Sequence, residues 1–377
     1  MNKKIIISLI ILAVVIAFFI FKDSRDSDTI KIGALFTLTG PQTTFGEAQQ
    51  KSALMAVKEV NAKGGIDGRK VELFMEDSAS DPKKAIDGYH ILKNKGVKIF
   101  DVEGSPIAVA TKDLIVGEKY FMLSSGATTP LYSDGSDLSC RMTATAKNIG
   151  PTHADYAIKN GYKRISVLAP NNEYGKGLAD ELSNSIIAKG GSIVIEELYD
   201  ASNINDFRTS VTKIKSKQGD IDAMFAINAA TSAQHMFKQI NDMGWDKPIL
   251  SDYNTMLNIP ADKLSLVNGV EFIDWDYSSK PRETDSAVAK EFKERYFAEY
   301  GKNPSLLDAG YYDGVKTILN AIEAVGDDPK DIGEYISNLK NYNVTTGVIK
   351  SFNTDCDAQR DLIFRVVADG VFVDVKN

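Results

Sequence analysis

The fold of this 377-residue chain is set by the stretch Ile30-Lys31-Ile32-Gly33-Ala34-Leu35-Phe36 and by the two segments that follow it. This apolar run predicts a buried strand, and residues 47–62 then place apolar side chains at helical spacing. Gly64-Gly65 ends that helix, because glycine tolerates the positive φ of a helix C-terminus. Residues 71–75 form the next strand. A strand, a helix and a strand in this order predict a parallel β-α-β unit.

The same alternation of strand and helix continues along most of the chain. Asp81-Pro82 and Ser105-Pro106 each predict the start of a helix, with the first side chain as the cap and proline in the first turn. Near Gly150 the alternation begins again, and a chain of this length is about right for two α/β cores. Further strands are expected at residues 97–102, 120–124, 165–169, 193–198, 223–227 and 249–250. The pattern therefore predicts two lobes, each built on a doubly wound parallel sheet.

The N-terminal residues predict a contact with a membrane. Lys3 and Lys4 precede residues 5–21, a run of 17 residues without a charge. Such a run fits a signal-peptide core or a short anchor. No small-x-small cleavage pattern and no cysteine for lipid follow it, which favours residues 1–28 as an uncleaved anchor. The lysines keep the N-terminus in the cytoplasm, so the chain after Asp28 is expected to be extracytoplasmic.

Composition and motifs exclude several classes of function. A net charge of −7 argues against nucleic acid as a partner. His90, His153 and His235 all fall in predicted helices, and no serine or cysteine has the flanking glycines of a nucleophile elbow. The sequence thus predicts neither an enzyme nor a metal or cofactor site. Cys140 and Cys356 either form one disulfide in an oxidising compartment or remain two separate buried thiols.

Ligands of open parallel sheets bind beyond the carboxyl ends of the strands, so the residues there are the candidate site. Ser105 stands at the positive end of a helix dipole, where a carboxylate is stabilised. Gly126-Ala127-Thr128 offers a second turn with backbone N–H groups and a hydroxyl. The plain alternative for both turns is helix capping. In the second lobe Tyr174 and Asp252-Tyr253-Asn254 lie at matching ends, although a lone tyrosine in a loop is more often surface.

Several spaced motifs follow one another in order between Ile30 and Val371. They are Ile32 to Pro41, Phe45-Gly46, Val60 to Ile66, Glu76 to Pro82, Ser124 to Thr128, Arg141, Glu173 to Gly177 and Gly347 to Phe352. Together these motifs resemble the type I periplasmic binding proteins of the leucine/isoleucine/valine-binding class.

This resemblance implies two Rossmann-like lobes, joined by three crossovers near Ala144, Trp275 and Val344, that close on a solute. Lobe I would then comprise residues 29–144 and 276–344, and lobe II residues 145–275 and 345–377. It also implies a monomer that delivers its ligand to the permease and ATPase subunits of an ABC-type importer. The alternative is the ligand-sensing ectodomain of a signalling system, although four residues before the apolar run leave no room for an output domain.

The resemblance also assigns roles to individual residues. Ser105, the Gly126 backbone and the Thr128 hydroxyl match the positions that hold a ligand carboxylate, and Tyr174 matches a tyrosine that covers the ligand. At four ligand-binding positions this sequence differs from the family pattern. The residues at these positions are Phe45, Ala146, Ala229 or Ala230, and Tyr253.

Two of these differences, Ala146 and Tyr253, replace the acids that bind a ligand amine. A buried ammonium without a counter-charge costs several kcal/mol. The resemblance therefore implies a carboxylate or amide that lacks this amine, unless Glu103, Glu173 or Asp252 supplies the negative charge. The family disulfide is also missing, because Ser80 and Gly104 occupy its positions.

Overall fold

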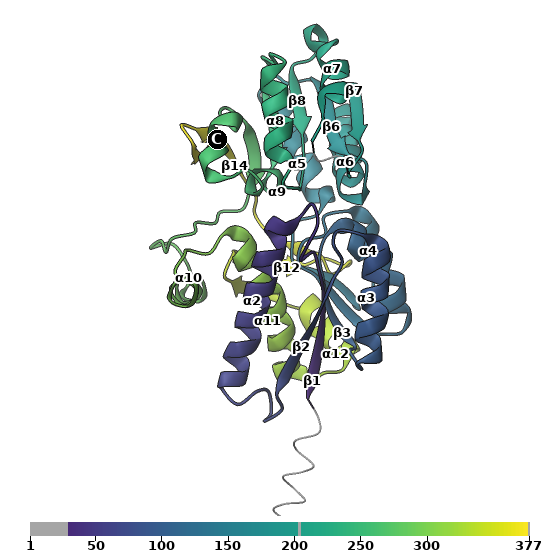
Figure 1. The fold of residues 1–377 in the computed structure, drawn as a ribbon, viewed down its shortest axis with the longest axis vertical. Helices are drawn as coiled ribbons and strands as arrows, with labels where there is room; N and C mark the ends of the chain where they lie inside the picture. Colours follow the sequence, from purple (N-terminus) through teal and green to yellow (C-terminus); the bar gives the residue numbers. More distant parts are fainter. Residues whose placement is uncertain (1–28, 203–204, 376–377) are drawn as a thin grey trace, which may run out of the picture.

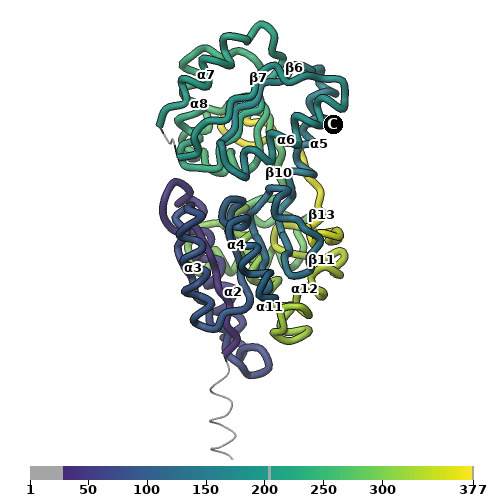
Figure 2. The backbone as a smooth tube through the Cα atoms, turned by 90° about the vertical axis from the view of Figure 1, so that its right-hand side faces the viewer, coloured from purple at the N-terminus to yellow at the C-terminus, as the bar shows by residue number. Residues whose placement is uncertain are grey.

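The computed structural model describes residues 29–202 and 205–375, which form two lobes stacked along the long axis of the molecule (Figures 1 and 2). Each lobe is a sheet with helices on both faces, as the alternation predicted. The predicted anchor, residues 1–28, lies outside the described residues. In the ranges that are described, no helix combines the length and the apolar character that crossing a membrane requires.

Lobe I is built on a sheet of five parallel strands in the order β2-β1-β3-β4-β5. The strands are β1 (Ile30–Phe36), β2 (Val71–Asp77), β3 (Ile99–Val102), β4 (Phe121–Ser124) and β5 (Ser139–Arg141). The helices of this lobe are α2 (Thr43–Ala62), α3 (Pro82–Asn94), α4 (Ser105–Gly117), α10 (Ala287–Tyr300), α11 (Leu306–Val325) and α12 (Pro329–Ser337).

Lobe II is built on a sheet of seven strands in the order β15-β14-β10-β9-β8-β6-β7. Its parallel strands are β6 (Arg164–Pro170), β7 (Ser192–Tyr199), β8 (Ala223–Ala226), β9 (Ile249–Asp252) and β10 (Glu271–Asp274). The hairpin β14 (Ile363–Ala368) and β15 (Val371–Asp374) adds an antiparallel edge. The helices are α5 (Ala146–Lys159), α6 (Glu173–Ala188), α7 (Arg208–Lys215), α8 (Ala233–Asp242) and α9 (Tyr253–Leu257).

Local sequence signals set most element ends. Gly64 and Gly65 have φ of 101° and 82° after α2, as predicted. Asp81 caps α3, where its carboxylate accepts a hydrogen bond from the Lys83 N–H. The capping prediction for Ser105 is wrong. Helix α4 begins at Ser105 itself, and Gly104, with φ of 74°, takes the cap position because it tolerates this conformation.

A third, antiparallel sheet changes the expected division of the chain. It contains β11 (Lys340–Val344), β12 (Gly347–Phe352) and β13 (Ala358–Gln359), and it lies beside lobe I in Figure 2. The family resemblance predicts that residues 345–359 belong to lobe II, with a crossover near Val344. Instead, β12 pairs with β11 of lobe I, so the third crossing falls at residues 360–362, just before β14 joins the second sheet.

A covalent and ionic clasp holds this third sheet against lobe I. Cys140 of β5 and Cys356 form a disulfide. Next to it, the fully buried Arg141 donates from Nε to the Asp357 carboxylate at 2.8 Å. Separating this buried ion pair would cost free energy, because each partner would then remain as a buried charge without a counter-charge. The clasp therefore fixes the segment that leads into the third crossing.

Candidate ligand-binding cleft

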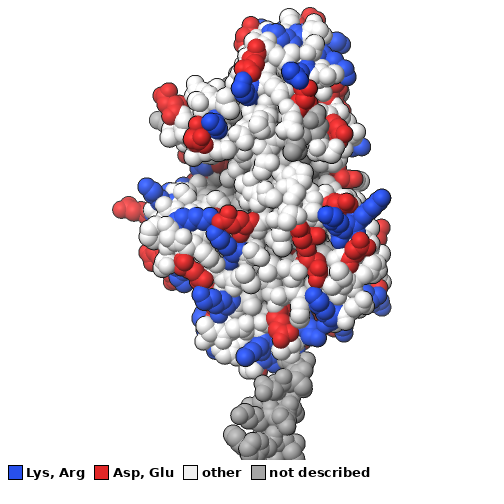
Figure 3. All heavy atoms as spheres, in the orientation of Figure 1, with Lys and Arg blue, Asp and Glu red and all other residues white. Residues whose placement is uncertain are grey.

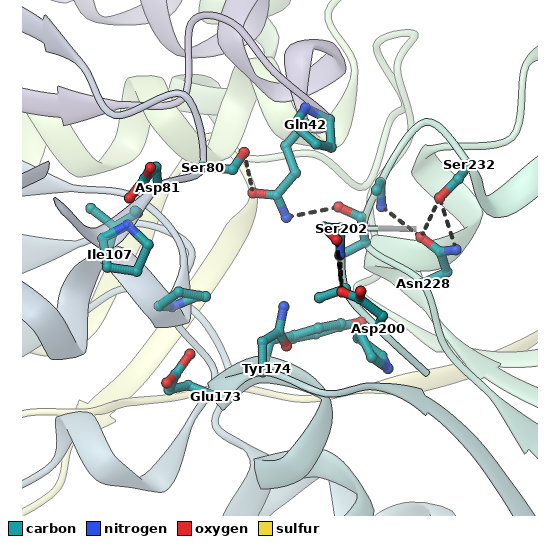
Figure 4. Close-up of a pocket in the computed structure, with 18 of the residues that line it drawn as sticks. Gln42, Ser80, Asp81, Ile107, Glu173, Tyr174, Asp200, Ser202, Asn228 and Ser232 are labelled. Carbon is teal, nitrogen blue, oxygen red and sulfur yellow. Dashed lines mark hydrogen bonds between the residues drawn. The ribbon is translucent and has the colours of Figure 1, made fainter. Parts of the chain in front are cut away.

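A cavity of about 480 Å³ lies between the two lobes, beyond the carboxyl ends of their strands. Figure 4 shows its walls. Lobe I contributes Gln42, Ser80 and Ile107, and lobe II contributes Tyr174, Asn228 and Ala229. This is the volume of a small-molecule site, and such sites are mostly apolar with a few placed polar groups. On the face drawn in Figure 3, acidic and basic side chains alternate over both lobes, while the zone where the lobes meet is mostly uncharged.

Ser105 links the two strand ends of lobe I that the sequence singled out. Its Oγ accepts hydrogen bonds from the backbone N–H groups of Thr128 and Thr129, at 3.1 and 3.2 Å. These bonds occupy the hydroxyl oxygen, and no acceptor for its own proton is found in the described residues. The adjoining first turn of α4 has no side-chain cap, and Ile107 of this turn lines the cavity. The Ser105 hydroxyl is therefore arranged as a donor.

The Gly126-Ala127-Thr128 turn is held from behind by Arg141. The guanidinium donates from Nη1 to the carbonyl oxygens of Ala127 and Thr129, both at 2.9 Å. The Ala127 N–H donates to the Ser124 hydroxyl. Thr128 is fully buried, and its Oγ1 has no hydrogen-bond partner in the part of the chain that the structure describes. A buried hydroxyl without a partner loses its hydration without compensation, so it marks a place for a ligand atom.

Tyr174, in the first turn of α6, lines the cavity from lobe II. Its hydroxyl donates to Oδ2 of Asp252 at 2.7 Å. The other oxygen of Asp252 accepts from the N–H and Oγ1 of Thr255. Burial raises the pKa of Asp252, while its hydrogen bonds with Thr255 and Tyr174 act in the opposite direction. Both carboxylate oxygens of Asp252 thus accept hydrogen bonds, and one of these bonds orients the Tyr174 ring.

Two hydrogen-bonded contacts join the lobes across the mouth of the cavity. The Gln42 side chain, which is labelled in Figure 4, donates from Nε2 to the carbonyl oxygen of Ala229 at 2.8 Å. Thr231 donates its N–H to the carbonyl oxygen of Pro41 at 3.1 Å. No local signal predicts this pairing, because Gln42 and Ala229 are 187 residues apart in the chain.

A second, inner cavity of about 30 Å³ lies near the crossings. Gly126, Tyr253, Trp275 and Tyr311 are among the residues that line it. The Tyr253 hydroxyl shares a 2.6 Å hydrogen bond with Thr143 of the first crossing, and its ring lies 5.4 Å from that of Trp275 at the second. Phe45 is buried beside Tyr311. Tyr253 therefore packs where the first and second crossings between the lobes lie, the region called the hinge below.

Two buried acids stand below this inner cavity, Asp101 in β3 and Glu103 just after it. Burial raises the pKa of Asp101 to about 7, and burial together with the charge of Asp101 raises the pKa of Glu103 to about 8. Hydrogen bonding to Ser125 and Tyr311 respectively lowers these values in part. In the sequence, Asp101 and Glu103 alternate with apolar residues at the end of β3. This pattern is a signal for two acids on one side of the chain.

The candidate residues from the sequence thus occupy three places. Tyr174 and Ala229 line the larger cavity, and Gly126 and Tyr253 line the inner one. Phe45, Ser105, Ala127 and Thr128 are buried in the wall of lobe I. Ser105 and Thr128 are joined by a hydrogen bond. In the described ranges no three His, Cys, Asp or Glu side chains are grouped as metal ligands.

Comparisons of sequence and structure find known proteins that are similar to this chain. A Leu/Ile/Val-binding protein homolog from Brucella abortus is 26% identical over 353 residues, which cover 92% of this chain and 91% of that protein. The isoleucine complex of a branched-chain amino acid transporter substrate-binding protein from Streptococcus pneumoniae is 27% identical, with a TM-score of 0.77 over 92% of this chain and 100% of that one. A benzoate-bound solute-binding protein from Rhodopseudomonas palustris shares the fold, at 17% identity and a TM-score of 0.80, over 92% of this chain and 96% of that one.

The family description "Periplasmic binding protein" matches residues 29–370, which is most of the chain. The matched range includes both lobes and every candidate site residue. The comparison proteins bind solutes for transporters and do not transform them, and the family acts outside the cytoplasm. The protein therefore belongs to the periplasmic binding protein family, and it is an extracytoplasmic solute-binding receptor rather than an enzyme.

Proposed function

We propose that this protein is the receptor of an ABC-type importer and that it binds a small solute through a carboxylate or amide group. The solute would lie in the cleft between the lobes, with that group on the Ser105 hydroxyl and the Thr128 hydroxyl. Tyr174 would cover it from lobe II. Residues 1–28 would anchor the receptor to the membrane that carries the permease and ATPase subunits. Relatives that bind branched-chain amino acids support the role as a transport receptor.

One observation carries the proposal, which is the pair of hydroxyls formed by Ser105 at the start of α4 and Thr128 in the loop after β4. The Ser105 oxygen already accepts hydrogen bonds from two N–H groups, so its own proton remains available for donation. The Thr128 hydroxyl is buried and has no partner in the described part of the chain. Both lie where the helix dipole presents positive charge, which favours an anionic or carbonyl oxygen. A ligand oxygen would satisfy both groups at once.

A thermal-shift screen of the full chain, kept in mild detergent, tests this proposal. The probes are proteinogenic amino acids, short amides and aromatic carboxylates, and a bound probe raises the melting temperature by mass action. Ser105→Ala should reduce the affinity for the bound probe about 10- to 100-fold, the usual loss for a hydrogen bond to a charged group.

The matched control is Ser216→Ala, which removes an exposed hydroxyl at the end of α7. It should bind the probe as the wild type does. Equal affinities of the Ser105→Ala variant and the wild type would contradict the proposed anchor. The absence of any shift with all three classes of probe would contradict the proposed ligand class.

A further inference from the structure

Glu103 is a buried acid for which the fold provides no cationic partner. Its side chain is 6% exposed, and its Oε2 has no hydrogen-bond partner in the described ranges. Both carboxylate oxygens lie against Gly126, since a β-carbon on that glycine would come within 2.4 Å of each. Gly126 and Tyr311, the two neighbours of the carboxylate, both line the inner cavity. The acid therefore packs directly behind two residues that line the inner cavity.

The charges around Glu103 favour a positively charged ligand group at this position. The titratable groups that face it are Asp101 from the same strand and the Tyr311 hydroxyl from α11. No lysine, arginine or histidine of the described residues contributes to its electrostatics. A buried carboxylate with an acid as its neighbour is costly to ionise, and a cation placed against it would repay that cost.

The other acids near the cleft are less suited to this role. Both oxygens of Asp252 already accept hydrogen bonds from Tyr174 and Thr255. Glu173 is half-buried at the outer wall of the larger cavity, on the opposite lobe from Ser105. Ala146 and Tyr253 carry no negative charge at neutral pH. Of the three acids that the sequence suggested, only Glu103 is buried with an unused oxygen.

Position along the strands places Glu103 next to the proposed carboxylate anchor. It precedes Ser105 by two residues just after β3, and Gly126 precedes Thr128 by two residues just after the neighbouring strand β4. The Ser105 and Thr128 groups are joined by a hydrogen bond. The Glu103 carboxyl group and the two hydroxyls therefore belong to the same pair of adjacent strand ends in lobe I, within two residues of one another along each segment.

We propose that Glu103 binds the ammonium group of an α-amino acid whose carboxylate lies on Ser105 and Thr128, so that lobe I alone holds both charges of the ligand. This inference rests on the proposed function and narrows its ligand to a zwitterion. The free protein keeps a proton on Glu103 at neutral pH, because its pKa is raised to about 8. The ligand ammonium replaces that proton, which is released to solvent.

Isothermal titration calorimetry of the full chain tests the inference. The probes are proteinogenic L-amino acids, each paired with the carboxylate that lacks only the ammonium, such as L-leucine with 4-methylpentanoate. The wild type should prefer the amino acid that it binds best by at least about 100-fold over its partner. Its affinity should fall about tenfold per pH unit below about pH 8, since the ammonium must displace the proton.

Glu103→Gln should remove the preference for the amino acid and the dependence of affinity on pH. Glu294→Gln, which neutralises an exposed acid of α10, should retain both. The comparison of paired probes in the wild type requires no variant, so a Glu103→Gln chain that fails to fold leaves the test intact.

Two results would overturn the inference. One is a preference for the amino acid that survives Glu103→Gln. The other is wild-type binding of amine-free carboxylates that is as tight as, or tighter than, that of amino acids. The second result, if it is sensitive to Ser105→Ala, would leave the proposed function standing, whereas an absence of binding to every probe would contradict both.

Discussion

His153 is a single residue whose environment gives the protein a measurable sensitivity to acid. The ring is fully buried in α5, between Phe225 and Phe364. Burial lowers its pKa from 6.5 to about 3, so the folded protein holds the ring neutral. The unfolded chain takes up a proton near pH 6.5. This contribution to stability is therefore fully present above pH 6.5 and is lost as the pH falls towards 3.

We expect His153→Phe to make the protein more resistant to acid. In the wild type this residue should lower the free energy of unfolding by about 2 kcal/mol between pH 7 and pH 5. Urea unfolding of the wild type and the variant at the two pH values measures the difference. His235→Phe, at an exposed position of α8, is the control and should retain the wild-type loss. An identical loss in the His153→Phe variant would show that the ring is not buried neutral.

At the scale of elements, Arg141 connects the ligand turn with the third sheet. One guanidinium binds the Ala127 and Thr129 carbonyl oxygens on one side and the Asp357 carboxylate on the other. Its five donors lie in a rigid plane, which a lysine ammonium cannot reproduce. The Cys140–Cys356 disulfide fastens the same two segments. The position of the turn thus depends on residues more than 200 positions away in the chain.

Arg141→Lys should lower the free energy of unfolding by about 3 to 5 kcal/mol, the range for breaking a buried ion pair. It should also weaken ligand binding, because the Gly126-Ala127-Thr128 turn loses its support. Arg164→Lys is the matched control. The side chain of Arg164 is 48% exposed and pairs with Asp222, so its loss should be within about 1 kcal/mol. Guanidinium chloride unfolding compares the two, and equal stabilities would show that Arg141 is not the clasp.

At the scale of the whole molecule, the two lobes meet in two regions. One is the hinge, where the crossings lie, and the other is the lip, the mouth of the larger cavity. Tyr253, Trp275 and Arg360 pack together where the crossings meet, with the guanidinium 4.1 Å from the centroid of the Trp275 ring. At the lip the lobes meet through the Gln42–Ala229 and Pro41–Thr231 hydrogen bonds. The closed arrangement has its own interlobe contacts, in addition to those that a ligand would add.

Gln42→Ala should shift the molecule towards an open form. We expect a larger radius of gyration without ligand by small-angle X-ray scattering, and a return to the wild-type value at saturating ligand. The ligand affinity should fall about 3- to 10-fold, the equivalent of one hydrogen bond. Gln50→Ala changes an exposed residue of the same helix and should alter neither quantity. A wild-type radius in the Gln42→Ala variant would mean that the lip contact does not hold the lobes together.

The sequence by itself determined the order of strands and helices, the parallel sheets and the family. Those features follow from signals within a few residues, such as the apolar run of β1, the Gly64-Gly65 ending of α2 and the Asp81 cap of α3. It also brought Ser105 and Thr128 forward as site residues, because the ends of parallel strands share one edge of a sheet.

Only the tertiary structure decided which lobe holds residues 345–359, which residues join across the cleft, and which acid packs against the Gly126 turn. The third sheet is fixed by a disulfide and an ion pair between segments about 216 residues apart. The burial of Glu103 depends on Gly126 and on Tyr311 of a distant helix. Burial and charge are properties of neighbours in space, and the chain brings those neighbours together only when it folds.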